Sequence, residues 1–422
     1  MKKNINQILD NSSKTKIYFL TWLILLSFLL RLISVYFVRD INIEHEWYIL
    51  LDNLIKYRSY SFYTFNDQLI PSVLLPPIYP FFLYFVKVVT SFEGSNFLYS
   101  IIFIQIILST YSVYLFYQLN QNFFSNKLSL INSIIFSVIP LNIYTCGQIS
   151  SITLQIFFSL LFLKFLLAIT EKQTKLNILI FSMVSGLLIL TRGEFILIFI
   201  LIVFFIYKNK KIKLINVIKI FIVVFLIISP YLARNYIHFN QIFLVKSLGF
   251  NLWKGNNELS RVEGYEEKFD RIEFQNLKLN LTNLEKNKYY EINRDNIFLD
   301  EAINNLNRNP FRYFKLFFEK FFSFYFIDLN SSYPNYYSFF HIFPIIILSA
   351  FSFPGLFIFY KINKFKNKCL GFYLFSNLII FSVFFILPRY KLIILPIQLI
   401  LSAYFIIFIL KKLNGKNFGR KI

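Results

Sequence analysis

Long apolar segments alternate with short polar segments along most of this chain, and this pattern predicts a protein that crosses a membrane many times. A helix rises about 1.5 Å per residue, so some 20 apolar residues cross a hydrocarbon layer about 30 Å thick. The ten expected spans are residues 17–37, 99–118, 128–144, 151–170, 176–190, 195–207, 214–231, 340–360, 369–386 and 392–410. The pattern therefore predicts an all-α, polytopic integral membrane protein.

Basic residues indicate which end of each span lies in the cytoplasm, because cytoplasmic loops of membrane proteins are enriched in lysine and arginine. The basic clusters are Lys2/Lys3/Lys14/Lys16, Lys172/Lys175, Lys208/Lys210/Lys211/Lys213, Lys361/Lys364/Lys366/Lys368 and Lys411/Lys412/Lys416/Arg420/Lys421. They predict that both termini are cytoplasmic. Residues 17–37 follow a polar, basic start and are expected to be an uncleaved start-transfer helix.

Two further apolar segments, residues 77–89 and 313–326, are too short for confident assignment as spans. If either crossed, the basic clusters that follow it would face outward, against the positive-inside rule. We therefore interpret both segments as interfacial or re-entrant helices. The expected domains are an N-terminal membrane module (1–231), a small outer cap (232–312) and a C-terminal membrane module (313–422).

Composition excludes a soluble globule, because 56% of the residues are hydrophobic. The chain has 44 basic and 22 acidic residues, 56 phenylalanines and only 11 glycines, a bias typical of an AT-rich genome. The net charge of +22 is therefore no sign of nucleic-acid binding. The two cysteines, Cys146 and Cys369, are expected at opposite membrane faces, where they form neither a disulfide nor a metal site.

The first expected outer loop, residues 38–98, concentrates scarce carboxylates. Asp40, Glu44 and Glu46 precede an amphipathic run at residues 47–55. One interpretation is a solvated acidic loop at a helix start, where the helix dipole favours negative charge. The other is a general base at the membrane surface, kept ionised by a neighbouring arginine.

Glu44-His45-Glu46 also suggests a divalent cation site, since carboxylate oxygen and imidazole both bind metals. Three adjacent residues cannot converge on one ion without other ligands. The histidines His45, His238 and His341 are scattered, so no zinc-type spacing exists, and no Ser/His/Asp nucleophile pattern is present. A divalent cation stays possible, and no metal ligand is assigned.

Arginines lie at the expected outer ends of several spans: Arg192, Arg234 and Arg389. One interpretation is that they anchor helices by snorkelling to the interface. Alternatively, guanidinium groups from three helices ring one cavity and grip a phosphate or pyrophosphate bidentately. Arg31 lies inside the first span, where a charge is costly, and is expected to face protein and pair with a carboxylate.

Several short stretches together resemble one family. They are Glu44-His45-Glu46-Trp47-Tyr48, Leu75-Pro76-Pro77-Ile78-Tyr79-Pro80, Thr191-Arg192-Gly193-Glu194, Pro230-Tyr231-Leu232-Ala233-Arg234-Asn235-Tyr236, Gly249-Phe250-Asn251-Leu252-Trp253-Lys254-Gly255-Asn256-Asn257, Asn309-Pro310 and Pro388-Arg389-Tyr390. In this order they resemble the bacterial relatives of the protein mannosyltransferases (glycosyltransferase family 39, GT-C fold), which include the lipid A aminoarabinose transferases.

The resemblance implies a glycosyltransferase of the inner (plasma) membrane. It would move a sugar from a polyprenyl-phosphate donor to a lipid, glycan or protein acceptor at the outer face, with inversion. The family's catalytic acid, usually Asp and four residues before a Tyr, falls on Glu44, with Asp40 and Glu46 as alternates. The other implied site residues are Arg192, Arg234, Arg389 and Lys391 for the donor phosphate, and Glu194, Asn235, Asn256 and Tyr390 for substrate.

Two other functions fit a polytopic chain. A lipid-linked sugar transporter or flippase predicts charged or broken helices at mid-membrane and repeat symmetry, whereas only Arg31 and Lys164 lie clearly within expected spans. A polymerase or ligase subunit for envelope glycans would use a similar arginine-rich outer cavity. The sequence determines neither the sugar nor the acceptor.

Overall fold

The computed structural model describes residues 2–38, 41–265, 271–362 and 364–414, and these are mostly helical. The α-helices are α1 (Lys2–Val38), α2 (His45–Tyr57), α3 (Ile78–Thr90), α4 (Gly94–Asn120), α5 (Asn126–Val138), α6 (Pro140–Gly147), α7 (Ile152–Glu171), α8 (Lys175–Thr191), α9 (Phe195–Lys208), α10 (Leu214–Phe239), α11 (Leu248–Gly255), α12 (Gln275–Thr282), α13 (Tyr290–Arg308), α14 (Pro310–Tyr325), α15 (Phe339–Lys361), α16 (Phe365–Val383) and α17 (Leu395–Leu413). Two 3₁₀ turns, η1 (Ile272–Phe274) and η2 (Pro388–Ile393), and two strands complete the described structure. The predicted all-α class is confirmed.

Six of these helices are long and apolar enough to cross a membrane: α1 (from Ile17), α4, α7, α10, α15 and α17. The pair α5 and α6, bent by 55°, makes a seventh candidate if it counts as one broken span. Every predicted span coincides with a helix or with this bent pair. The count of ten is approximate, because α8 and α9 have only 17 and 14 residues. The two short apolar segments are helices α3 and α14.

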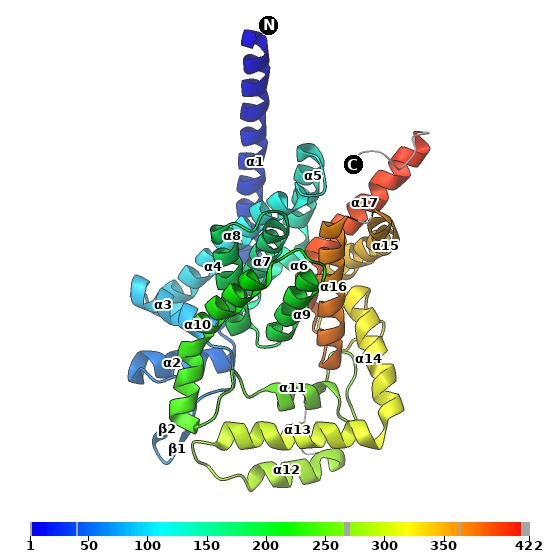
Figure 1. Cartoon of the computed structure of the whole chain (residues 1–422). Helices are drawn as coiled ribbons and strands as arrows, with labels where there is room; N and C mark the ends of the chain where they lie inside the picture. The colour runs from blue at the N-terminus through cyan, green and yellow to red at the C-terminus, as the bar shows by residue number, and fades with distance from the viewer. Residues whose placement is uncertain (1, 39–40, 266–270, 363, 415–422) are drawn as a thin grey trace.

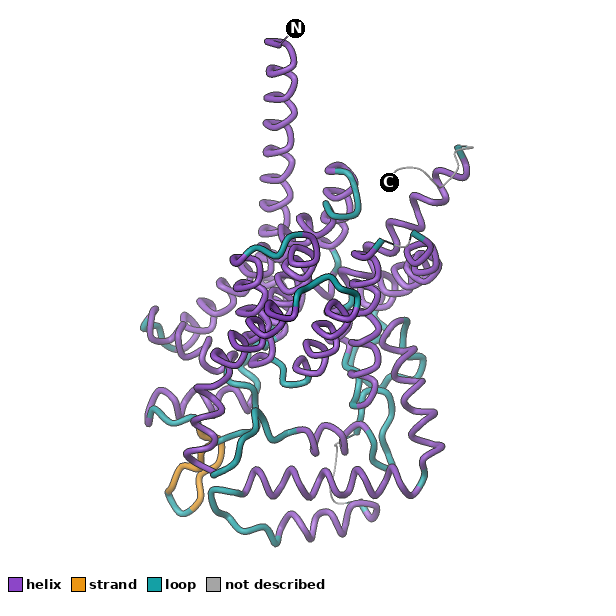
Figure 2. Tube along the Cα trace, in the orientation of Figure 1, coloured by secondary structure: helices purple, strands orange, loops and turns teal. Residues whose placement is uncertain are grey.

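The helices form a bundle whose two ends differ. The N-terminal part of α1 and the C-terminal part of α17 project from one end, while α2, the strands and α11 to α13 lie at the other (Figure 1). Figure 2 shows the two strands beside the helices of this second end. The polar segments predicted to share one face therefore do lie together at one end of the molecule.

Buried polar residues fix the membrane helices to one another. Arg31 is fully buried in α1, as predicted, but the structure gives it no carboxylate partner among the described residues. Its guanidinium donates to Ser109 Oγ (2.7 Å) and Ser27 Oγ (2.6 Å). Hydroxyl groups therefore satisfy much of its hydrogen-bonding capacity. Cys146 and Cys369 are both buried free thiols that form no disulfide.

A β-hairpin that the sequence analysis missed follows α2. Strands β1 (Ser61–Phe65) and β2 (Gln68–Pro71) are antiparallel. Asn66 and Asp67 join them with φ angles of 47° and 60°. Positive φ at both positions is typical of a two-residue turn that matches the twist of a hairpin, and Asn and Asp tolerate it better than most residues.

One arginine ties this hairpin to α10. Arg234 donates to the backbone oxygens of Ser72 (2.7 Å) and Tyr60 (3.0 Å). The next residue, Asn235, is fully buried and donates to the carbonyl of Phe243 (2.8 Å). Arg234 therefore satisfies backbone oxygens at the two ends of the hairpin, and Asn235 satisfies one in the segment that follows α10.

A buried carboxylate ties the same hairpin to α13. Glu291, only 3% exposed, accepts hydrogen bonds from Val73 N (2.5 Å) and Ser72 Oγ (3.0 Å). Burial raises the pKa of Glu291 to about 7, although these hydrogen bonds and Arg234 act in the opposite direction. Near neutral pH the fold therefore carries a buried acid close to its titration point.

Glu291→Gln should change how stability depends on pH. A folded-state pKa above the unfolded value means that the stabilising contribution of Glu291 is complete below about pH 4.5 and is lost as pH rises through about 7. This difference corresponds to about 3 kcal/mol. Thermal unfolding in detergent measures this. The unfolding temperature should differ less between pH 5 and pH 8 in Glu291→Gln than in the wild type.

Asp300→Asn, which removes an exposed carboxylate from the same helix, is the matched control and should behave like the wild type. If the unfolding temperature changed equally with pH in Glu291→Gln and in the wild type, the raised pKa of Glu291 would be contradicted.

Candidate functional site

A large cavity lies where the first loop, α8 to α11 and the end of α16 meet. Its volume is about 940 Å³. The polar and charged residues lining it are Glu44, Glu46, Ser150, Ser151, Thr191, Arg192, Glu194, Ser247, Asn251, Lys254, Arg389 and Tyr390. This cavity therefore contains five of the charged site residues predicted from the sequence. They come from three separate parts of the chain.

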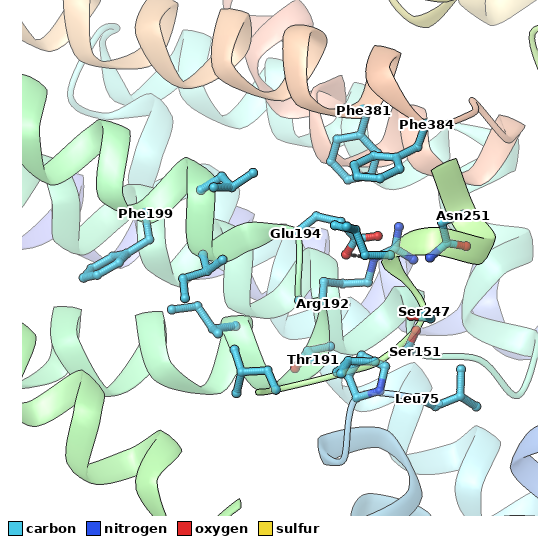
Figure 3. A pocket seen from close by; sticks show the side chains of 18 of the residues that line it. Leu75, Ser151, Thr191, Arg192, Glu194, Phe199, Ser247, Asn251, Phe381 and Phe384 are labelled. Atoms are coloured by element: carbon cyan, nitrogen blue, oxygen red, sulfur yellow. Dashed lines mark ion pairs between the residues drawn. The ribbon is translucent and has the colours of Figure 1, made fainter. Parts of the chain in front are cut away.

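The cavity has a group of polar side chains and, away from it, a continuous apolar wall. Arg192, Glu194 and Asn251 lie close together, whereas Phe199 lies well away from them (Figure 3). The apolar wall is formed by α8 to α10 and contains Ile189, Ile196, Leu197, Phe199, Ile200, Phe221, Val224, Phe225, Ile228 and Leu232. Such a shape suits an amphiphile with an anionic head and a hydrocarbon tail.

Glu44 lies at the start of α2 and is held by two partners. Arg389 Nη1 donates to its Oε1 (3.3 Å), and Trp47 Nε1 donates to its Oε2 (3.2 Å). Trp47 is buried and packs edge-on against Tyr79, with ring centroids 5.1 Å apart. A rigid aromatic pair therefore sets the position of the carboxylate. The alternate Glu46 also lines the cavity, and Asp40 lies outside the described residues.

Arg192 occupies the turn between α8 and α9. Its Nε lies 3.7 Å from Glu194 Oε2, and its guanidinium carbon lies 4.5 Å from the centroid of the Tyr390 ring. An aromatic face attracts a cation and limits its motion. Arg192, Glu194 and Tyr390 therefore form one unit on the cavity wall, beside the Glu44–Arg389 pair.

The remaining predicted site residues do not line the cavity. Arg234 and Asn235 hold the backbone around α10, as described above. Asn256 is buried and donates to the carbonyls of Leu252 (2.8 Å) and Val383 (2.9 Å), so it joins α11 to α16. Lys391 is buried, donates to the carbonyl of Phe326, and has its pKa lowered to about 7 by burial. Their expected contacts with substrate stay predictions without support from the cavity geometry.

Sequence analysis missed the contribution of α11. Ser247, Asn251 and Lys254 all line the cavity, and their spacing of four and three residues puts them on one face of a helix. This spacing was the signal available in the sequence, and Asn251 and Lys254 lie within the stretch already noted for its resemblance. Among the described residues, no group of three or more His, Cys, Asp or Glu side chains is placed to hold a metal ion. The charged residues can instead bind an anion and accept a proton.

Comparison with known proteins gives one family match and several structural matches. The model of the dolichyl-phosphate-mannose-protein mannosyltransferase family matches residues 76–233. This segment includes Arg192 and Glu194 but neither Glu44 nor Arg389. A search of curated protein sequences finds no significant match.

The structural matches include structures of an oligosaccharyltransferase from Archaeoglobus fulgidus. One of them, archaeal oligosaccharyltransferase AglB in complex with an inhibitory peptide and dolichol-phosphate, aligns with a TM-score of 0.56 and 14% identity, covering 97% of this chain and 53% of that one. The enzyme tethered to an acceptor peptide aligns with a TM-score of 0.58 and 15% identity, covering 95% and 50%. The chain thus spans about half the length of these structures.

The fold and the family match agree with the resemblance drawn from the short stretches. The chain is therefore similar to the dolichyl-phosphate-mannose-protein mannosyltransferases over residues 76–233, and it has the GT-C fold that it shares with the archaeal oligosaccharyltransferase.

Proposed function

We propose that this protein is a membrane glycosyltransferase that moves a sugar from a polyprenyl-phosphate donor to a lipid, glycan or protein acceptor. The observation that carries the proposal is the contact between Glu44 and Arg389 in a cavity that also contains Arg192. The matching family is described as acting with dolichyl-phosphate-mannose, and one matching structure holds dolichol-phosphate.

The donor fits the cavity in one direction. Its phosphate would bind between Arg192 and Arg389, whose planar guanidinium groups suit phosphate oxygens. Its isoprenoid tail would follow the apolar wall that includes Phe199, Phe225 and Ile228. Burial of hydrocarbon against this wall contributes about 25 cal/mol per Å², so the tail supplies binding energy while the arginines fix the head.

The reaction is then a single displacement. Glu44 takes the proton of an acceptor hydroxyl, and the hydroxyl oxygen forms a bond with the anomeric carbon. The bond from that carbon to the phosphate oxygen breaks, and its electron pair stays on the phosphate. Positive groups at the developing charge lower the barrier. Attack opposite the leaving phosphate inverts the anomeric centre.

Donor binding also affects the base. Arg389 donates to Glu44 at 3.3 Å in the ligand-free protein, so an incoming phosphate competes with Glu44 for the same guanidinium. Occupation of Arg389 by phosphate would loosen Glu44 and make it available to the acceptor. A lipid-linked sugar transporter, in contrast, needs no proton acceptor beside its phosphate-binding arginines.

The proposed orientation puts the cavity at the outer face of the inner membrane, with both termini in the cytoplasm. We expect reporter tags at Lys210 and after Ile422 to be cytoplasmic and a tag near Thr282 to be external, because basic loops stay inside. Protease protection or a compartment-specific reporter measures this. An external tag at Lys210 would contradict the orientation.

Glu44→Gln should abolish transfer while the protein stays folded. Glutamine keeps the size and hydrogen bonding of the side chain but accepts no proton, so the rate should fall at least about 100-fold. Transfer of labelled sugar from a synthetic polyprenyl-phosphate donor by purified protein measures this. Glu93→Gln is the matched control, since Glu93 also pairs with a cation, Lys87 (3.5 Å), but lies outside the cavity.

Affinity for the lipid phosphate provides a second readout on the same variant. Glu44→Gln should bind polyprenyl phosphate at least as tightly as the wild type, because the competitor for Arg389 has lost its charge. Near-normal turnover by Glu44→Gln, together with loss of turnover in Asp40→Asn, would transfer the role of base to Asp40.

A further inference from the structure

We infer that Lys254 is a third phosphate-binding cation of the cavity, one that acts on the charge developing at the leaving phosphate. The inference rests on the proposed function, and neither the sequence patterns nor the family match assigned Lys254 a role. It is carried by the way in which α11 and its neighbours hold this residue at the cavity.

The backbone of Lys254 is fixed on several sides. Its carbonyl accepts hydrogen bonds from Tyr265 N (2.8 Å) and Ser260 Oγ (2.9 Å). The carbonyl of the next residue, Gly255, accepts one from the buried ammonium of Lys320 (2.7 Å). The last carbonyl groups of a helix have no partner within the helix. At the C-terminal end of α11, those of Lys254 and Gly255 are hydrogen-bonded to neighbouring segments.

Two glycines allow neighbouring segments to press against this end of α11. A Cβ atom on Gly255 would lie 2.0 Å from the carbonyl oxygen of Phe384, so only glycine permits this approach to the end of α16. Gly264 has φ of +80°, and a Cβ atom there would lie 2.9 Å from Lys254 Cγ. The loop therefore covers the stem of Lys254 closely and limits the directions available to it.

The side chain of Lys254 lines the cavity. Its Nζ lies 4.8 Å from the centroid of the Phe385 ring, which also lines the cavity. Asn251, one turn earlier on the same face of α11, lies beside Arg192 and Glu194 (Figure 3). Lys254 thus lines the same cavity as Arg192 and Arg389 but comes from a different part of the chain.

The chemistry explains what a third cation contributes. The donor is a phosphodiester with one negative charge, whereas the leaving polyprenyl phosphate is a monoester with close to two at neutral pH. The bond between the anomeric carbon and the phosphate oxygen breaks, and its electron pair adds the second charge to that oxygen. An ammonium group near the phosphate would stabilise the additional charge as it forms.

The test uses Lys254→Met, which removes the charge but keeps a stem over Phe385. We expect kcat to fall roughly tenfold to a hundredfold with a smaller change in KM for the donor, because the contact strengthens as charge develops. Affinity for undecaprenyl phosphate should fall by a similar factor. Lys254→Arg, which keeps the charge, should recover most of both.

Lys288→Met is the matched control, since Lys288 also lies over an aromatic ring, that of Tyr289 (5.0 Å), but outside the cavity. Lys254→Gln is a second uncharged variant, and unfolding temperature and gel filtration show whether each variant folds. Unchanged kcat and lipid-phosphate affinity in a folded uncharged variant would overturn the inference while leaving the proposed function intact. A wild type that neither binds undecaprenyl phosphate nor transfers sugar would overturn both.

Discussion

The site depends on one ion pair that joins residues 345 positions apart, Glu44 at the start of α2 and Arg389 at η2. Neither side chain is well placed alone. Glu44 is also held by the Trp47 indole, which is buried against Tyr79, and Arg389 belongs to a turn whose next residue, Tyr390, supports Arg192. The pair is partly exposed, so its Coulomb energy is modest. Its importance is geometric, because it sets a proton acceptor against an anion-binding group in one cavity.

The surrounding elements serve to hold charged groups at the edge of an apolar bundle. Arg234 and Glu291 tie the hairpin to α10 and α13. Two buried amide side chains, Asn235 and Asn256, donate hydrogen bonds to backbone carbonyl groups beside the cavity. The resemblance implied that Arg234 binds the donor phosphate and that Asn235 and Asn256 bind substrate, and these roles stay predictions. In the structure all three side chains donate hydrogen bonds to backbone carbonyl groups, which helps to keep the walls of the cavity in place.

Hydropathy predicted the helices well, because an apolar segment of about 20 residues has few alternatives to a membrane helix. It was less reliable for short elements. The hairpin at Ser61–Pro71 turns through Asn-Asp instead of the more usual Asn-Gly, so its turn was not apparent. The contact of Arg31 with Ser109 could not be predicted either, since Ser109 lies 78 residues away on α4. That Arg192 and Arg389 share a cavity was suggested by their places at the expected outer ends of spans. The contact between Glu44 and Arg389 was not predicted, because pairing between remote segments leaves no local pattern.

The most direct test of this account is an experimental structure of the protein with undecaprenyl phosphate. The account predicts a phosphate within hydrogen-bonding distance of Arg192 and Arg389, with the tail along the wall that contains Phe199 and Phe225. It also predicts that Glu44 has moved away from Arg389. A phosphate bound elsewhere, with the Glu44–Arg389 pair intact and the cavity free of lipid, would contradict it.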